Sequence, residues 1–210
     1  MNEETQKHTP VLLDEVINAI NPQSGKLYFD ATFGWGGYSE KLLDTCACKV
    51  IAIDQDPSVK DKASELKKKY GDRFNFIESK FSEITTVLKK MDINKVDGFM
   101  FDIGVSSMQL DNSNRGFSFN KDGPLDMRMS SRGKTAAEFI NSIKEEDLAD
   151  IIYNYGDERK SRKIAKFIVE YRSDSPIVTT TQLANIISKA IPKKHNHKKH
   201  PATKTFQAIR

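Results

Sequence analysis

The sequence predicts an α/β fold with an open parallel sheet in its first half and a helical subdomain in its second half. Residues 1–103 contain four short apolar segments that alternate with stretches of helical periodicity. This alternation is typical of βαβ units. Beyond a polar stretch, the apolar stripes have only helical spacing. A length of 210 residues suits one large domain or two small ones.

The elements of the first half follow one another at short intervals. A helix is expected over residues 11–20, and Pro22 ends it. Pro57 suits the first turn of a later helix because its fixed φ is already helical. The elements expected after Pro22 are a strand at 27–33, a helix from about 38, a strand at 49–53, a helix at 57–70, a strand at 74–77, a helix marked by Phe81, Ile84, Val87, Leu88 and Met91, and a strand at 96–103.

The second half is expected to be helical after a long irregular segment. Residues 109–132 are rich in Asn, Ser, Gly, Asp and Arg, which is typical of a loop. Thr135 and Glu138 have the spacing of a capping box, which predicts a helix start. Three helical stripes and the start of a further helix follow: Leu148 with Ile151 and Ile152; Ile164 with Phe167, Ile168 and Tyr171; Leu183 with Ile186, Ile187 and Ala190; and residues 203–210.

Composition narrows the class of protein. Hydrophobic residues make up 38% and charged residues 30%, which is typical of a globular chain rather than a disordered one. The chain has no run of about 18 apolar residues and no apolar signal region at its start, so we expect a cytoplasmic protein without a membrane span. Cys46 and Cys48 have no matching second pair, so we expect two reduced thiols and no metal site.

Charge is segregated along the chain. All 29 acidic residues lie at or before Asp174, whereas residues 175–210 hold seven Lys and Arg, three His and no acid. Such a block favours a polyanionic partner, with nucleic acid as the first candidate, and a solvated surface loop is the alternative. The stretch from Lys189 to Lys204 is the main candidate for RNA contacts. Its histidines (His195, His197 and His200) lie among lysines, which disfavours a bound metal ion.

A glycine-rich turn follows the first expected strand. Gly34, Gly36 and Gly37 stand immediately before a helix, where a ligand meets free N–H groups and a close backbone. Asp54 ends the second strand 20 residues after Gly34, and a carboxylate there accepts hydrogen bonds from both ribose hydroxyls of an adenosine. The alternative is a tight turn with a capping Asp. Ser39 stands where the dinucleotide fingerprint has its third glycine, so that fingerprint is incomplete.

Two further acids are expected beside this turn. Asp30 precedes the glycines and Asp102 closes the fourth strand. The carboxyl ends of parallel strands share one rim, where ligands of open α/β sheets bind. Asp30 disfavours a pyrophosphate there but stabilises the cationic amino and sulfonium groups of S-adenosylmethionine. The sequence therefore favours this methyl donor, with an NAD-dependent oxidoreductase as the alternative.

Eight segments give the chain a resemblance to a known family. They are HTPVLLDE (8–15), DATFGWGGYS (30–39), AIDQDP (52–57), FDIGVSSMQLD (101–111), RGFSF (115–119), DGPLDMRM (122–129), YGDER (155–159) and HPATKTFQAIR (200–210). With them the chain resembles the ribosomal RNA small subunit methyltransferase H family, MraW-like enzymes that methylate the N4 amine of a cytidine in 16S ribosomal RNA. The resemblance covers nearly the whole chain, and the middle segments are long and specific.

The resemblance implies a class I (Rossmann-like) methyltransferase sheet with an inserted all-helical subdomain. It implies a core over residues 1–108, a loop and helical insert over 109–201, and the start of a return to the core over 202–210. Because the family continues further, we expect this sequence to be the front part of a longer protein. An inactive RNA-binding fragment is therefore an alternative to an active enzyme. The implied substrate is small-subunit RNA, in the ribosomal particle or alone.

The family's donor contacts fall on seven positions: Gly36, Gly37, Tyr38, Asp54, Phe81, Asp102 and Gln109. Tyr38 departs from the family, which usually has His there, but its backbone still meets the donor. The glycines are expected to hold the methionine end and Asp54 the ribose. Phe81 is expected beside the adenine, with a core aromatic as the alternative.

The expected reaction assigns further roles. The N4 amine of cytosine is a poor nucleophile that needs a hydrogen-bond acceptor and in-line placement. Asp102, or a backbone carbonyl after it, is the candidate acceptor. Phe117 and Phe119 are candidates for stacking on an extruded base, or else they pin their loop to the helical subdomain. Arg128 and Arg132 either contact phosphates or pair with Asp122 and Asp126.

Overall fold

The chain forms two compact units, residues 1–104 and 105–210. The structure is a computed structural model that describes residues 10, 12–191 and 199–210. Each unit has hydrophobic clusters of its own. Within the described ranges, no helix is both long and apolar enough to cross a membrane.

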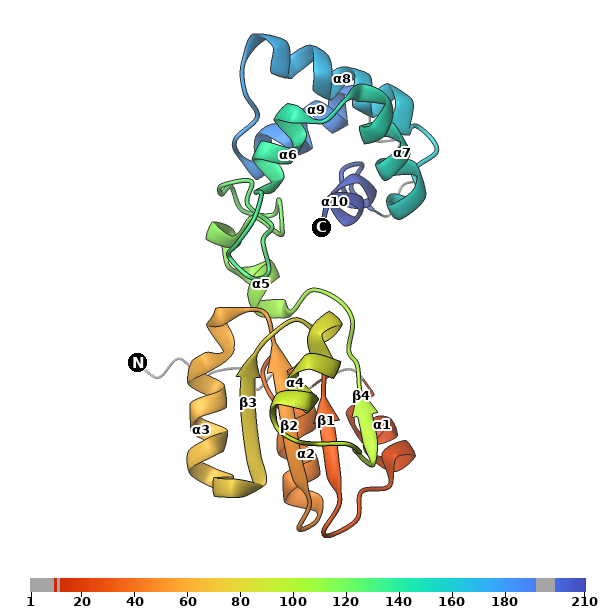
Figure 1. Ribbon diagram of the computed structural model, residues 1–210. Coiled ribbons are helices and arrows are strands. Elements are labelled where there is room, and N and C mark those ends of the chain that lie inside the picture. Colours follow the sequence, from red (N-terminus) through yellow and green to blue (C-terminus); the bar gives the residue numbers. More distant parts are fainter. Residues whose placement is uncertain (1–9, 11, 192–198) are drawn as a thin grey trace, which may run out of the picture. The chain divides into compact units, whose positions relative to one another are not determined.

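The first unit holds the α/β part of the chain (Figure 1). Its elements are α1 (Leu13–Ile20), β1 (Leu27–Asp30), α2 (Gly37–Thr45), β2 (Lys49–Asp54), the 3-10 helix η1 (Pro57–Val59), α3 (Lys60–Tyr70), η2 (Gly71–Arg73), β3 (Phe74–Glu78), η3 (Phe81–Glu83), α4 (Ile84–Lys90) and β4 (Gly98–Met100). The expected alternation of strand and helix is confirmed.

The four strands form a parallel sheet in the order β3-β2-β1-β4. The chain proceeds from β1 to β2 and β3 on one side and then crosses to β4 on the other. The order therefore reverses between β1 and β4. In open α/β sheets such a switch point opens a crevice beyond the carboxyl ends of the strands, where ligands bind.

The two faces of the sheet are covered by different helices. Side chains alternate along a strand, so Tyr28, Val50 and Ala52 pack with α1, α2 and α3. Phe29 and Ile51 face the other way and pack with Val87 of α4. Figure 1 shows α4 in front of the sheet and α2 behind it. Burial on both faces explains why the strands read as continuous apolar runs.

Two strands are shorter than expected. β1 ends at Asp30 rather than residue 33, and β4 spans Gly98–Met100 rather than 96–103. Beyond Asp30, the Ala31 and Phe33 amides still donate to Met100 O and Ile53 O, both at 2.9 Å. Gly34 then turns the chain with a φ of +50°. Apolar composition continues past the point where the sheet register ends, so it overestimates strand length.

The second unit is helical, as expected. Its elements are α5 (Ser107–Asp111), η4 (Ser113–Arg115), α6 (Ala136–Ser142), α7 (Glu145–Gly156), α8 (Ser161–Asp174), α9 (Thr180–Ala190) and α10 (Thr203–Ile209). The interpretation of 109–132 as entirely irregular is wrong, because α5 and η4 extend into it. Ser106 and Gln109 form a capping box that starts α5, and their spacing was a signal in the sequence.

The core of this unit joins the expected apolar stripes. Leu148, Ile164 and Leu183 are completely buried in one cluster, and the capping box of Thr135 and Glu138 is present. Phe206 of α10 is buried in the same cluster. Residues 202–210 thus pack within the second unit, and a return to the sheet beyond them remains a prediction.

Candidate functional site

The candidate site lies at the carboxyl ends of β1, β2 and β4. In the sheet register, Asp30 is level with both Ala52 and Met100. Asp54 and Asp102 each stand two residues further along, level with Thr32 beyond the end of β1. The charges of Asp54 and Asp102 both act on the Asp30 carboxyl. The three acids therefore converge at the carboxyl ends of the strands, as expected, with Asp30 deeper than the other two.

Asp54 connects the glycine turn to the end of β2. Its Oδ2 accepts a 2.8 Å hydrogen bond from the Gly34 amide, and its Oδ1 accepts a 2.9 Å bond from the Asp56 amide. Burial raises the pKa of the Asp54 carboxyl above its usual value, and these backbone bonds oppose that rise. The Asp54 carboxylate thus fixes the backbone of the glycine turn. Its expected contact with a ribose remains a prediction.

Gly36 and Gly37 stand where a side chain would meet neighbouring rings. Gly36 has a φ of +75°, and a Cβ there would lie 2.8 Å from the ring of Phe33. A Cβ on Gly37 would overlap the ring of Pro10. Gly37 begins α2, so the turn brings a helix N-terminus to the rim.

Asp30 lies beneath the rim rather than on its surface. Its side chain is completely buried, and it accepts hydrogen bonds from Ser39 Oγ at 2.6 Å and from the Thr32 amide at 3.2 Å. Burial raises the pKa of Asp30 to about 6, the two hydrogen bonds oppose the rise, and the charges of Asp54 and Asp102 add to it. Because it is enclosed, Asp30 could affect a ligand only through its charge and through the residues it holds.

Asp102 and Tyr38 complete the rim. Asp102 is exposed just beyond β4, and its amide donates a 2.7 Å hydrogen bond to Thr32 Oγ1. Tyr38 is buried at the start of α2. Its burial, followed by the charges of Asp102 and Asp30, raises the pKa of its hydroxyl. Thr32 and Ser39 were not among the expected site residues, because single hydroxyl side chains have no periodic or spacing signal.

Phe81 is not a core aromatic. It opens η3 immediately after β3, and 45% of its surface is exposed. Its ring stands edge-on to that of Phe101, with centroids 6.4 Å apart. The alternative of an ordinary buried aromatic is wrong, because a core side chain would be enclosed. The adenine contact remains a prediction.

Gln109 lies in the second unit, where it has a local role. Its side-chain Oε1 accepts a 3.0 Å hydrogen bond from the Ser106 backbone amide, and the Gln109 backbone amide donates to Ser106 Oγ at 3.2 Å. This capping box buries the Gln109 side chain at the start of α5. Its expected contact with the donor remains a prediction.

The loop aromatics pin their segment to the helical core. Phe117 is completely buried in the cluster of the second unit. The ring of Phe119 packs 4.8 Å from that of Phe206 and 4.7 Å from that of His200. The expectation that Phe117 stacks on a base is therefore wrong, because the core already surrounds its ring. The structural alternative is confirmed for both residues.

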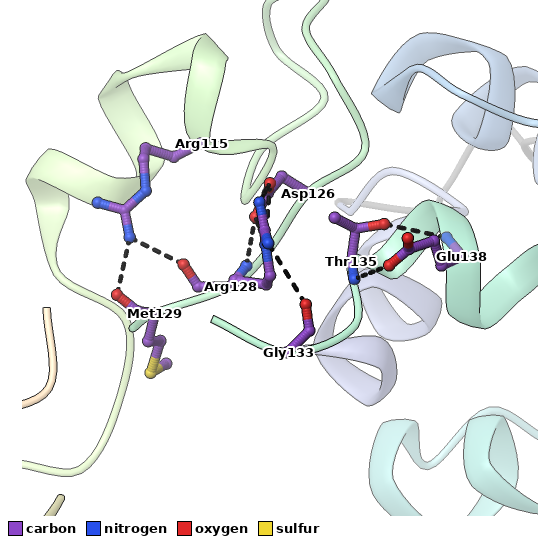
Figure 2. Close-up of polar contacts among 7 residues, drawn as sticks. All are labelled: Arg115, Asp126, Arg128, Met129, Gly133, Thr135 and Glu138. Atoms are coloured by element: carbon purple, nitrogen blue, oxygen red, sulfur yellow. Dashed lines mark hydrogen bonds and ion pairs between the residues drawn. The ribbon is translucent and has the colours of Figure 1, made fainter. Parts of the chain in front are cut away.

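Arg128 is paired within the protein. Figure 2 shows its guanidinium against the Asp126 carboxylate, with Nη2 2.6 Å from Oδ2 and Nε 3.0 Å from Oδ1. In the same loop Arg115 donates to the carbonyls of Arg128 at 2.9 Å and Met129 at 3.1 Å. Of the two expected acids, Asp126 is the one that pairs with Arg128, and Asp122 accepts a 2.6 Å bond from Thr181 Oγ1. A phosphate contact for Arg128 is therefore disfavoured.

The remaining expectations concern metals, thiols and the basic stretch. In the part of the chain that the structure describes, no three His, Cys, Asp or Glu side chains gather as metal ligands do. Cys46 and Cys48 are free thiols, and burial raises the pKa of Cys48 to about 12. The centre of the basic stretch, with His195 and His197, lies outside the described residues.

Comparison with known proteins agrees with this geometry. A family model described as the MraW methylase family matches residues 5–210. The chain is similar to "Ribosomal RNA small subunit methyltransferase H" of Maricaulis maris (strain MCS10), with 53% identity over 97% of this chain and 60% of the relative. It is 52% identical to the proteins of the same name from Rickettsia massiliae (strain Mtu5), over 98% of this chain and 66% of the relative, and Ehrlichia canis (strain Jake), over 97% and 69%.

The chain therefore spans 60 to 69% of the length of these curated relatives. Its match to the family model leaves out only the first four residues. The resemblance that the motifs indicated is confirmed. The family model matches nearly the full length of a chain that also has three strand-end acids around its glycine turn. The chain therefore belongs to the MraW methylase family.

Proposed function

We propose that this chain carries the donor site of a methyltransferase that uses S-adenosylmethionine to methylate the N4 amine of a cytidine in 16S ribosomal RNA. The observation that carries the proposal is the strand-end cup, which we define as Asp30, the turn 34–37, Asp54 and Asp102. It stands at the switch point of a parallel sheet, where α/β proteins bind their ligands. The relatives bear the name of a small-subunit ribosomal RNA methyltransferase.

The donor set of the cup fits the proposed cofactor. S-adenosylmethionine supplies an electrophilic methyl group on a sulfonium cation, and three carboxylates make the potential of the cup negative. Each carboxylate oxygen has two acceptor positions, so Asp54 can bind ribose hydroxyls in addition to the Gly34 and Asp56 amides. The exposed ring of Phe81 offers a surface for the adenine. Gly36, Gly37 and the backbone of Tyr38 are proposed to hold the methionine end.

Asp102 is proposed to serve the nucleophile. The lone pair of the cytosine amine is delocalised into the ring, so the amine attacks only when an acceptor draws on its hydrogens and orients it. Asp102 is the exposed acid of the cup, two residues beyond the end of β4, where a substrate from solvent can reach it. Its carboxylate, or a backbone carbonyl after it, accepts the amine hydrogen. The target base leaves its stack to reach this position.

Most of the second unit is proposed to be an inserted helical subdomain that engages the RNA. The core is proposed to cover residues 1–108, the loop and insert 109–201, and the return to the core to begin at 202–210. The basic stretch from Lys189 to Lys204 neutralises phosphates in this proposal. The reaction takes place in the cytoplasm on the small ribosomal subunit or its RNA. Gln109 is proposed to contact the donor from α5.

Two measurements test the proposal. Calorimetry with S-adenosylhomocysteine and, separately, NADH is expected to detect binding of the first ligand only. NADH binding without S-adenosylhomocysteine binding would instead support an oxidoreductase. Methyl transfer from tritiated S-adenosylmethionine to 16S RNA and to small subunits is then followed by nucleoside analysis, which is expected to yield N4-methylcytidine. Donor binding with no methyl transfer to either substrate would identify an inactive fragment.

A further inference from the structure

We propose that Thr32 is a positioning residue for methyl transfer, because its hydroxyl holds the backbone of Asp102 in the orientation that the reaction needs. The inference rests on the proposed function, in which Asp102 serves the nucleophile. Thr32 Oγ1 accepts a 2.7 Å hydrogen bond from the Asp102 amide. Thr32 follows β1 and Asp102 follows β4, so they lie on either side of the switch point. The donor and the target base are both proposed to bind there.

Asp102 needs such support because it lies beyond the last paired residue of β4. The register between β1 and β4 ends at the pair Asp30 and Met100. The Ala31 amide donates to Met100 O at 2.9 Å. The segment from Phe101 to Gly104 beyond it is exposed. The Thr32 hydroxyl therefore extends the contact between the two strand ends by one further hydrogen bond, at the residue proposed to act on the amine.

Thr32 is itself held from below. Its amide donates to Asp30 Oδ1 at 3.2 Å, and Asp30 Oδ2 accepts a 2.6 Å bond from Ser39 Oγ on α2. Asp30 and Ser39 are both completely buried. The series Ser39, Asp30, Thr32, Asp102 thus joins the helix after the glycine turn to the acid on the rim. A hydroxyl on a residue whose backbone is fixed by a buried carboxylate is better placed to orient a neighbour than a mobile surface group is.

The test compares three side chains at position 32. Thr32→Val keeps the shape of the side chain and removes the acceptor, whereas Thr32→Ser keeps the acceptor. Thr32→Ala gives the same comparison if valine disturbs the fold. Thr45→Val is the matched control, since the Thr45 hydroxyl donates to the Lys41 carbonyl within α2. We expect Thr32→Val to lower kcat for methyl transfer roughly 10- to 100-fold, as misplacement of a reacting group does, with the KM for donor little changed.

A second readout needs neither donor nor RNA. In the ¹⁵N–¹H spectrum of the free protein, the Asp102 amide is expected to shift upfield and exchange faster with solvent in Thr32→Val. Thr32→Ser and Thr45→Val are expected to keep the wild-type shift and exchange rate. Thr32→Ser is also expected to restore most of kcat. A merely structural role would not produce this split between kcat and KM or its rescue by serine.

The outcomes separate this inference from the proposed function. Wild-type kcat in Thr32→Val, or an unchanged Asp102 amide, overturns the inference alone if the wild-type chain methylates RNA. Equal loss in Thr32→Val and Thr32→Ser also overturns it. A wild-type chain that fails to bind S-adenosylhomocysteine overturns both proposals. A wild-type chain that binds it without transferring methyl leaves the donor site standing and overturns the roles proposed for Asp102 and Thr32 in methyl transfer.

Discussion

The amide of Gly34 donates a 2.8 Å hydrogen bond to Oδ2 of Asp54, which joins the turn after β1 to the end of β2. The two residues are 20 positions apart in the chain. Because the other oxygen of Asp54 accepts from the Asp56 amide, one carboxylate organises both loops of the strand-end cup. The same group is proposed to bind the donor, so its replacement is expected to affect both stability and binding.

Asp54→Asn is expected to lower the affinity for S-adenosylhomocysteine at least about tenfold, since hydrogen bonds to a charged acceptor contribute roughly 1.5–3 kcal/mol. The asparagine NH₂ must also face either the Gly34 or the Asp56 amide, which are both donors. Calorimetry measures the affinity, and urea unfolding measures the accompanying loss of stability. Asp72→Asn is the matched control because Asp72 is fully exposed beside Lys67. Equal affinities in the two variants would contradict the proposed role.

The buried carboxyl of Asp30 is expected to make stability depend on pH. Burial raises its pKa from 3.8 to about 6, despite hydrogen bonds from Ser39 and Thr32 and with contributions from Asp54 and Asp102. The folded state then binds more protons than the unfolded state between these values. The stability that Asp30 contributes is therefore complete below about pH 4 and is lost as the pH rises through about 6. The shift corresponds to about 3 kcal/mol.

Asp30→Asn isolates this contribution, because the amide is isosteric and its charge does not change with pH. Tyr38, Asp54 and Asp102 also face this carboxyl, and they are common to both proteins. Urea unfolding at pH 4, 5, 6 and 7 is expected to show the variant gaining stability relative to the wild type as the pH rises. Parallel curves for the two proteins would mean that Asp30 does not titrate in this range.

Gly36→Ala is expected to destabilise the first unit more than Gly25→Ala. Both glycines have a positive φ, +75° and +79°, so the backbone strain of alanine is similar at the two sites. At Gly36 the new Cβ would lie 2.8 Å from the Phe33 ring, whereas at Gly25 nothing lies within 4 Å. We expect an additional loss of about 1–3 kcal/mol from overpacking, measured by urea unfolding, and weaker donor binding only for Gly36→Ala. Equal stabilities would contradict the steric argument.

Gly156→Ala tests the packing of α10 on α7. Alanine is the better helix former by about 1 kcal/mol, so propensity alone predicts a gain in stability. A Cβ at this position would, however, lie 2.5 Å from the backbone oxygen of Lys204. Backbone atoms move less easily than side chains, so we expect a net loss of about 1–3 kcal/mol. Thermal unfolding decides between the two effects. A rise in Tm would show that α10 can shift to accommodate the methyl group with little loss of stability.

Arg128→Lys distinguishes an internal ion pair from a phosphate contact. Lysine keeps the charge but lacks the planar fork that meets both oxygens of Asp126. We expect a small loss of stability, because an ion pair close to solvent contributes little, and unchanged affinity for 16S RNA at fixed salt. The affinity is measured by filter binding across a salt series. Weaker RNA binding with unchanged stability would instead assign Arg128 to the RNA.

Local patterns predicted much of the first unit. The alternation of apolar runs and helical stripes identified all four strands, and the glycine turn with Asp54 identified the rim that the sheet brings together. Strand ends were less accurate, because the end of β4 depends on its pairing with β1 rather than on its own composition. The loop aromatics were ambiguous for a similar reason. Only the packed structure shows that the helical core encloses Phe117.

The family, the class of fold and the acids of the cup could be predicted from the sequence, because they depend on residue type at fixed spacing along the chain. The burial of Asp30, the hydrogen bond from the Asp102 amide to Thr32 and the pairing of Arg128 with Asp126 became visible only in the folded chain. Burial and hydrogen-bond partners are set by what packs around a residue, and residues 70 positions apart, such as Thr32 and Asp102, meet only when the sheet forms.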